Sequence, residues 1–221
     1  MDISRAKEVL DYWFSKGLYT ADFDKWFMKS QDYDEEIREK FGDLLKEAEQ
    51  GKGFGWLVSK ESYVAYIILM DQFSRHIYRG TGDSFKSDNG CMIFVELGWD
   101  IYSKQLKGYE FMFAFMPYMH TENEKYQNKG EIYFHRHKNL YSESNDRRIG
   151  VLTRYSLSVD EVTNYDKECE MLKSMEPHVL GHKQTIQMFG RFPKRNSVLG
   201  RETTIQEGQY LNREEVKKRA Y

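Results

Sequence analysis

The chain has 221 residues, 40% of them apolar, and its 33 Lys and Arg against 35 Asp and Glu give a formal charge of −2. This length suffices for one domain with a sizeable core, and the near-neutral charge argues against a nucleic-acid-binding surface. The longest apolar run, residues 63–70, is too short to span a bilayer, and acidic residues interrupt any early signal-like run. We therefore expect a cytoplasmic protein with reduced Cys91 and Cys169 that binds neither nucleic acid nor a membrane.

Helical periodicity begins at the N-terminus. Asp2 and Ser4 are candidate caps of a first helix that ends near Gly17. The pair Asp32 and Glu35 has the spacing of a capping box, which predicts a second helix from this point to about residue 51.

The middle of the chain predicts three further helices. The first, residues 59–79, is apolar on every side over residues 63–70, so we expect it to be central and buried. The next helix covers about residues 87–102. A short helix over residues 109–116 is expected to close before Pro117, because proline disfavours helical backbone in the residue before it.

Capping-box patterns recur in the C-terminal half. Thr121 opens a helix that runs to about residue 137, and the same pattern opens helices at Ser158, Thr204 and Asn212. Residues 141–164 are polar and rich in Ser, Asn, Asp and Arg, which predicts a long loop or insertion.

Strand-like alternation is nearly absent from this pattern. The sequence therefore predicts an all-α fold in a single domain over residues 1–221. Successive antiparallel helices without a sequence repeat permit either a TPR-like array, which is an α/α superhelix, or a closed bundle.

Two polar clusters carry the candidate chemistry, and the first lies in the most apolar helix. Asp71, Arg75 and Arg79 recur every four residues, and Asp71 with Arg75 has the spacing of an intrahelical ion pair. One interpretation is that Asp71 orients both arginines toward an anionic ligand. The other is that the ion pair is structural and ties helices together.

The second cluster follows Gly190 and contains Arg191, Arg195, Asn196 and Arg201. Arg191 is explained as a cation at a helix C-terminus, but the other three lie beyond the helix. Three arginines this close repel one another unless a negative group lies among them. That group is either a phosphate or carboxylate ligand or one of the carboxylates of Asp71, Asp88 and Glu122.

Two histidines are candidate proton-transfer groups. His120 is expected at a helix start, where the helix N-terminus lowers its pKa and keeps it neutral, although a histidine bonded within a turn is the simpler alternative. His182 lies one helical turn after His178, a spacing compatible with a metal pair. Because no Cys pair or compact His/carboxylate motif accompanies them, we predict no metal and no cofactor.

Four segments together resemble the uncharacterised bacterial family DUF924. Tyr12 to Phe14 matches its FWF segment, and residues 71–80 match D-Q-F-P-R-N-x-x-R-G. Residues around His120 match L-P-x-x-H-S-E-D, and His182 with residues 189–201 matches H-x-x-x-x-x-x-F-G-R-F-P-H-R-N-x-x-L-G-R. The chain departs from these patterns at Ser74, His76, Asn123 and Lys194.

The resemblance covers about residues 5–130 and 175–212. It implies a compact, all-helical, TPR-like single domain. The family has no established reaction to transfer to this chain, so any chemistry has to be argued from the residues themselves.

The leading hypothesis is an anion-binding pocket whose members are Arg75, Arg79, Arg191, Arg195 and Arg201, positioned by Asp71 and Asn196. His120 or His182 would then transfer a proton in hydrolysis or group transfer on a small phosphorylated or carboxylated molecule. The alternative is a scaffold that binds a peptide or protein partner in an open groove. A third hypothesis, in which the motifs only brace the fold, predicts that every arginine finds a carboxylate and that no pocket remains.

Overall fold

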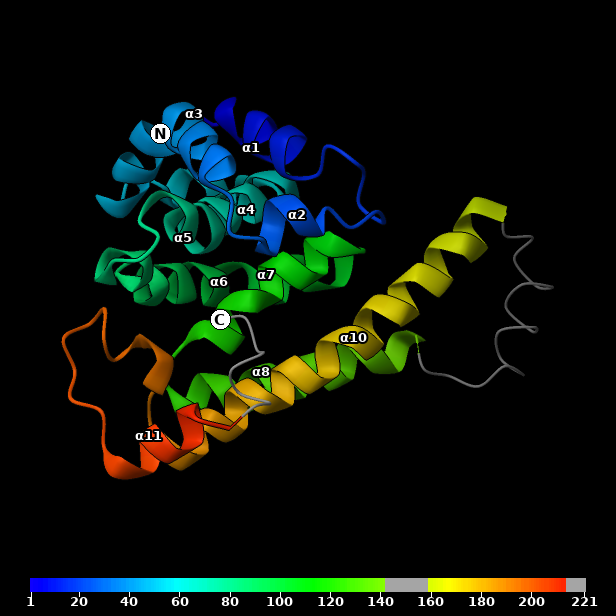
Figure 1. Ribbon diagram of the computed structural model, residues 1–221. Helices are drawn as coiled ribbons and strands as arrows, with labels where there is room; N and C mark the ends of the chain where they lie inside the picture. The colour runs from blue at the N-terminus through cyan, green and yellow to red at the C-terminus, as the bar shows by residue number, and fades with distance from the viewer. Residues whose placement is uncertain (142–158, 214–221) are drawn as a thin grey trace.

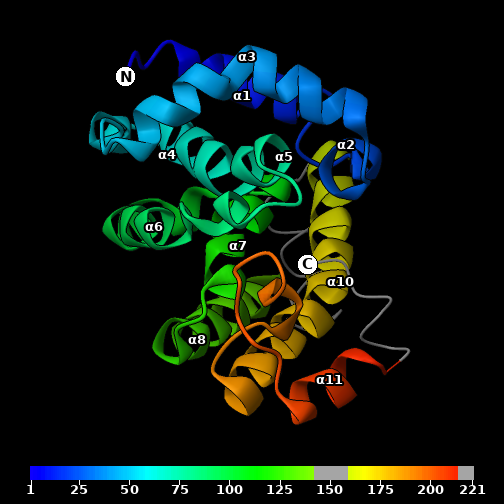
Figure 2. The ribbon, with the colours of Figure 1, turned by 60° about the vertical axis from the view of Figure 1, so that its left-hand side comes forward.

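The computed structural model describes residues 1–141 and 159–213, and all regular structure in these ranges is helical. The helices stack in successive layers from the N-terminal helices to α8 and α10, and the chain after α10 turns back toward α6 and α7 (Figures 1 and 2). The predicted all-α class is confirmed. Its refinement to a TPR-like array stays a prediction.

The N-terminal layer contains α1 (Arg5–Trp13), α2 (Phe23–Phe27) and α3 (Gln31–Glu49). The first helix ends four residues before the predicted Gly17, and α2 was not predicted. The capping box predicted at Asp32 is also wrong. Ser30, whose backbone is extended, caps α3 by accepting a hydrogen bond from the Tyr33 amide at 3.5 Å, which places Asp32 inside the helix.

The central helical run follows the short 3₁₀ helix Phe54–Val58 and consists of α4 (Lys60–Ile67), a π-helical turn (Ile68–Phe73) and α5 (Ser74–Ile77). Residues 63–70 are buried on every side, as predicted. The π turn was not predicted, and such turns are frequent at functional sites.

Two long helices form the next layer. After the 3₁₀ helix Gly82–Phe85, α6 (Asp88–Tyr102) matches the predicted span and is followed by the 3₁₀ turn Ser103–Gln105. The prediction that the next helix closes before Pro117 is wrong, because α7 (Tyr109–His120) continues through it.

Burial explains how α7 passes its proline. Proline removes one helical hydrogen bond, but residues 110–119 are all buried, so packing on every side holds the helix together. As a result His120 is the last residue of a helix, and the predicted position of His120 at a helix start is wrong.

Helices α8 (Glu124–Tyr141) and α10 (Val159–Phe189) lie side by side in Figure 1. The prediction that Thr121 caps α8 is wrong by two positions. Asn123 caps this helix, because its Oδ1 accepts a hydrogen bond from the Lys125 amide at 3.0 Å. The predicted loop over 141–164 is too long at both ends. The rest of the predicted loop, residues 142–158, lies outside the described residues, and so does the capping residue predicted at Ser158.

The C-terminal segment contains the 3₁₀ turn Pro193–Arg195 and α11 (Ile205–Leu211). The capping box at Thr204 is confirmed, with reciprocal bonds to Glu207 of 3.2 and 2.8 Å. Asn212 follows the end of α11, and the tail helix predicted to start there falls mostly outside the described residues.

An aromatic core joins the layers. Trp13 of α1 is fully buried and packs edge-on against Phe73 and Phe113, each with a ring-centroid distance of 5.3 Å. In the described part of the chain, Cys91 and Cys169 are not joined by a disulfide. In the ranges that the structure describes, no helix combines the length and apolarity needed to cross a bilayer.

Candidate functional site

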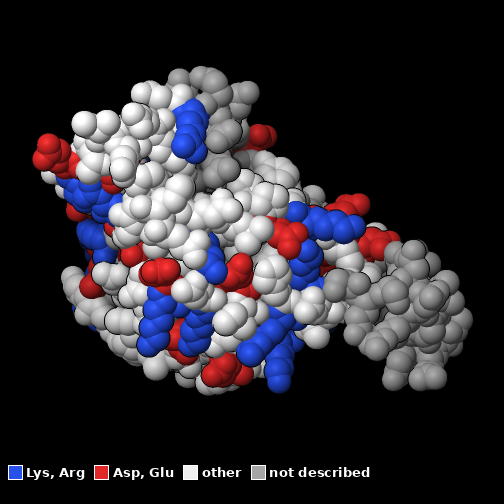
Figure 3. All heavy atoms as spheres, turned by 90° about the horizontal axis from the view of Figure 1, so that it is seen from below, with Lys and Arg blue, Asp and Glu red and all other residues white. Residues whose placement is uncertain are grey.

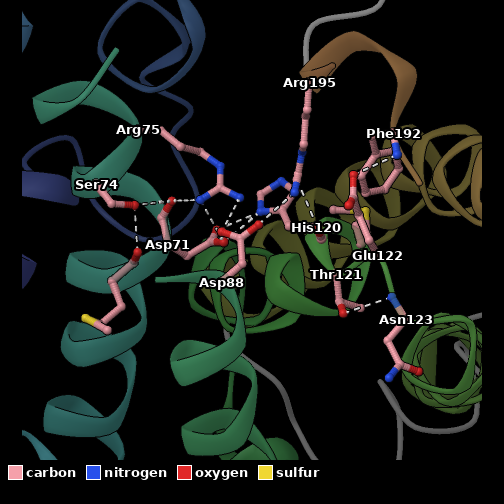
Figure 4. A network of polar contacts seen from close by, with 12 residues as sticks. Asp71, Ser74, Arg75, Asp88, His120, Thr121, Glu122, Asn123, Phe192 and Arg195 are labelled. Carbon is pink, nitrogen blue, oxygen red and sulfur yellow. Dashed lines mark hydrogen bonds and ion pairs between the residues drawn. The ribbon is translucent and has the colours of Figure 1, made fainter. Parts of the chain in front are cut away.

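The first polar pair of the site joins the π turn to the end of α7. Asp71 is fully buried, and its two carboxylate oxygens lie 2.8 and 2.9 Å from Nδ1 of His120 (Figure 4). Gln72 Nε2 donates to the same carboxylate at 2.5 Å. The sequence separation of His120 from Asp71 is 49 residues, so only the packing of α7 against the central run brings them together.

Two arginines meet at a second carboxylate beside this pair. Arg75 contacts Asp71 Oδ1 at 3.2 Å, which confirms the predicted intrahelical pair, and its other nitrogen donates to Asp88 at 3.0 Å. Arg195 donates to the other oxygen of Asp88 at 2.9 Å and to the backbone oxygen of His120 at 2.9 Å. We call Asp71, Arg75, Asp88, His120 and Arg195 the His120 centre.

Aromatic rings hold the Arg195 guanidinium in place. It lies over the rings of Phe85 and Phe192, at 4.2 and 4.7 Å from their centroids. Arg195 is only 8% exposed, and its burial lowers the pKa of the guanidinium while Asp88 opposes this change. Its geometry is therefore fixed by stacking as well as by charge.

The electrostatics of the His120 centre favour a neutral imidazole beside a charged carboxylate. Burial would raise the pKa of Asp71, but Arg75 and then His120 outweigh burial and lower this pKa to about 2. Burial lowers the pKa of His120, against the opposing effect of Asp71. The predicted direction for His120 is confirmed, but its cause is burial and not a helix N-terminus.

His182 of α10 lies beside the His120 centre, with a ring-centroid distance to His120 of 6.2 Å. Burial, followed by the nearby His120, lowers the pKa of His182 to about 3. Its Nδ1 donates to the backbone oxygen of His178 at 2.7 Å, so these two histidines are linked through the backbone. In residues 1–141 and 159–213 no three His, Cys, Asp or Glu side chains form a metal-binding group.

The other predicted arginines pair elsewhere. Arg79 lies beyond the end of α5 and forms no ion pair with Asp71. It binds both carboxylate oxygens of Asp34, at 2.5 and 2.8 Å. Arg201 binds Glu122 at 2.6 and 3.0 Å.

Arg191 and Asn196 share a third carboxylate, that of Glu207 at the start of α11. Arg191 contacts it at 2.6 and 2.9 Å, and Asn196 Nδ2 lies 3.2 Å from it. Asn196 Oδ1 and Arg201 Nε are buried without a hydrogen-bond partner in the described part of the chain.

The structure thus divides the predicted site into separate groups. Asp71, Arg75, Arg195 and His120 come together, whereas Arg79, Arg191 and Arg201 each have a carboxylate of their own. Asp88 and Glu122 were among the predicted partners. Asp34 and Glu207 were missed, because each lies in the first turn of a helix, where the helix dipole already explains an acidic residue.

Charges on the surface are also mixed. On the face in Figure 3, lysine and arginine side chains lie among aspartate and glutamate.

The structure contains a pocket of about 510 Å³. It is lined by residues 18–21, by the start of α7 and by residues of α10, and none of the predicted site residues lines it.

Comparison with known proteins gives a family and a structural neighbour. Residues 9–215 match the model of a family described as bacterial protein of unknown function (DUF924). The fold is similar to that of a protein of unknown function from Agrobacterium tumefaciens, with 27% sequence identity, a TM-score of 0.68, and coverage of 95% of this chain and 97% of that chain. No curated protein matches the chain. Since the family model matches well over half of its residues, the chain belongs to the DUF924 family.

Proposed function

We propose that this protein is an acid–base enzyme that acts on a small anionic molecule, with His120 as the general base. The observation that carries the proposal is the contact of both oxygens of the fully buried Asp71 with Nδ1 of His120. A carboxylate in this position orients an imidazole and stabilises the cation that forms when it takes up a proton.

The tautomer of His120 follows from the state of its partner. Because Asp71 has a pKa of about 2, its carboxylate is ionised near neutral pH and can only accept hydrogen bonds. Nδ1 of His120 therefore carries the proton, and Nε2 presents a lone pair. The His120 side chain is 16% exposed, and we propose that a water molecule or a substrate hydroxyl reaches the ring from its exposed part.

Arg75 and Arg195 supply directed donors for an anionic group beside this base. Arg195 donates two of its five N–H groups to Asp88 and the His120 carbonyl, and we propose that a phosphate or carboxylate group of the substrate binds to the remaining ones. The two arginines are balanced in charge by Asp71 and Asp88. Binding would therefore depend on the geometry of these donors more than on a net positive charge.

The first experiment is a thermal-shift screen of phosphate, nucleotides, sugar phosphates and dicarboxylates, repeated on Arg195→Ala. We expect at least one anion to raise the Tm of the wild type and to lose this effect in the variant. Hydrolysis of p-nitrophenyl phosphate is measured in parallel, with His120→Gln as the test and His135→Gln as the matched control. The proposal fails if no anion shifts the Tm and both histidine variants behave as the wild type does.

The alternative proposal is a binding module for a peptide or protein partner. The observation that favours it is an apolar stripe on α6, where Ile93, Leu97 and Ile101 follow one another at four-residue spacing and are 54%, 51% and 60% exposed. The two proposals differ in the screen. A partner-binding module would show no anion-dependent shift, and Arg195→Ala would lower only the Tm of the free protein.

A further inference from the structure

A pocket of about 510 Å³ lies apart from the His120 centre. Its lining comes from the segment after α1, the start of α7 and the first half of α10. This volume falls in the range of about 300–1,000 Å³ that is typical of small-molecule sites. The residues that matter for its chemistry are Tyr19, Tyr109, Lys167, Glu170 and Met171.

The pocket is held by backbone contacts at Gly108. The amide of Tyr109 donates to the Leu18 carbonyl at 2.9 Å, and the amide of Gly108 donates to Glu168 at 2.5 Å. Glu168 is 1% exposed, and its other oxygen lies 3.3 Å from Nε2 of His137. Three walls from distant parts of the sequence are therefore fixed to one another, and the pocket is formed before any ligand arrives.

One wall presents two opposite charges one helical turn apart. Lys167 and Glu170 both lie on α10, both are exposed, and neither forms an ion pair or hydrogen bond within the described ranges. Residues at this spacing have Cβ atoms about 5–6 Å apart, so their flexible side chains reach an ammonium and a carboxylate on one small molecule.

The pocket lining also includes two aromatic side chains, Tyr19 and Tyr109. Burial, with a contribution from Glu168 and Glu110, raises the pKa of Tyr19, and burial also raises that of Tyr109. Both phenols are therefore protonated near neutral pH and combine a flat apolar ring with a hydrogen-bond donor. The buried Met171 adds apolar surface next to the two charges.

We propose that this pocket binds a small zwitterion of the amino-acid type, which carries an amine, a carboxylate and an apolar or aromatic side chain. The amine lies against Glu170, the carboxylate against Lys167, and the side chain packs between Tyr19, Tyr109 and Met171. This site is independent of the proposed function of the His120 centre.

The test uses three probes that share a phenyl ring on a short carbon chain and differ in their charged groups. L-phenylalanine carries both charges, phenethylamine carries only the amine, and 3-phenylpropionate carries only the carboxylate. Binding is measured by isothermal titration and by thermal shift on the full chain. The variants are Lys167→Met and Glu170→Gln, with Lys173→Met as the matched control, because Lys173 lies on α10 but does not line the pocket.

We expect L-phenylalanine to bind more tightly than either analogue. Each pocket variant should weaken its binding about tenfold, the size expected for one charged hydrogen bond, while Lys173→Met leaves it unchanged. Lys167→Met should also abolish the preference of the protein for L-phenylalanine over phenethylamine. The proposal is overturned if no probe binds, if all three bind equally, or if His120→Gln rather than a pocket variant removes the binding.

Discussion

Arg195 and Asp88 form an ion pair of 2.9 Å across 107 residues of sequence, and this pair docks the segment after α10 onto the start of α6. Asp88 also binds Arg75, so one carboxylate joins the C-terminal segment to the central helical run. The buried guanidinium of Arg195 is thus part of the scaffold as well as of the proposed site.

We predict that Arg195→Lys lowers the free energy of unfolding by about 1–3 kcal/mol. A lysine keeps the charge but cannot contact Asp88 and the His120 carbonyl in the same fork or stack on Phe85 and Phe192. Urea unfolding followed by circular dichroism measures the change. Arg136→Lys, at an exposed position of α8, is the control and should be neutral within about 0.5 kcal/mol.

Asp71→Asn is expected to destabilise the protein by about 2–3 kcal/mol at pH 7, because it leaves Arg75 and His120 beside a neutral group in a buried site. Arg75 keeps its contact with Asp88, which limits the loss. The exposed Asp100→Asn on α6 is the matched control. Equal unfolding midpoints for the two variants would contradict a structural role for the buried charge.

The stability of the protein should fall in mild acid because of His182. Burial lowers its pKa from an ordinary 6.5 to about 3, so protons bind preferentially to the unfolded state. The contribution of His182 is complete above pH 6.5 and declines as the pH falls toward 3, by roughly 2–3 kcal/mol between pH 6 and pH 4.

Comparison of variants isolates this contribution. His182→Gln should flatten the dependence of the unfolding free energy on pH, whereas His135→Gln should keep the wild-type slope. His76, whose pKa is also lowered by burial, titrates in all three proteins and cancels in the comparison. Parallel curves for His182→Gln and the wild type would show that protonation of His182 does not oppose folding.

Local sequence patterns such as helical periodicity and capping boxes predicted the all-α class well. They failed for features of the helices that depend on packing against distant residues. The Thr204 capping box depends on neighbouring residues and was found. The continuation of α7 through Pro117 depends on burial by other helices, which no local pattern records. The π turn that carries Asp71 is equally invisible to a helical period.

The site shows the same division. The pair of Asp71 and Arg75 follows from a four-residue spacing and was predicted. Its link to His120 spans two helices, so the sequence suggested His120 for a different reason, a helix start that does not exist. The arginines looked uncompensated in the sequence because their carboxylates lie up to 107 residues away.

A pair of glycine substitutions tests the junction at Gly108. Gly108 has φ 53° and ψ −135°, a conformation that side chains avoid, and an added Cβ would lie 2.3 Å from the Leu18 carbonyl oxygen. Gly108→Ala should therefore lower the free energy of unfolding by about 2–4 kcal/mol, through backbone strain and the displacement of the Leu18 segment.

Gly208→Ala is the matched change in an open helical position. Gly208 lies inside α11, and an added Cβ meets nothing within 4 Å. Alanine should stabilise the protein there by about 0.5–1 kcal/mol, because it restricts the unfolded chain without straining the helix. Urea midpoints that move in opposite directions would confirm that Gly108 fixes the loop against α7. If Gly108→Ala moves the midpoint as Gly208→Ala does, the Leu18 segment is free to shift, and the pocket beside it is not preformed.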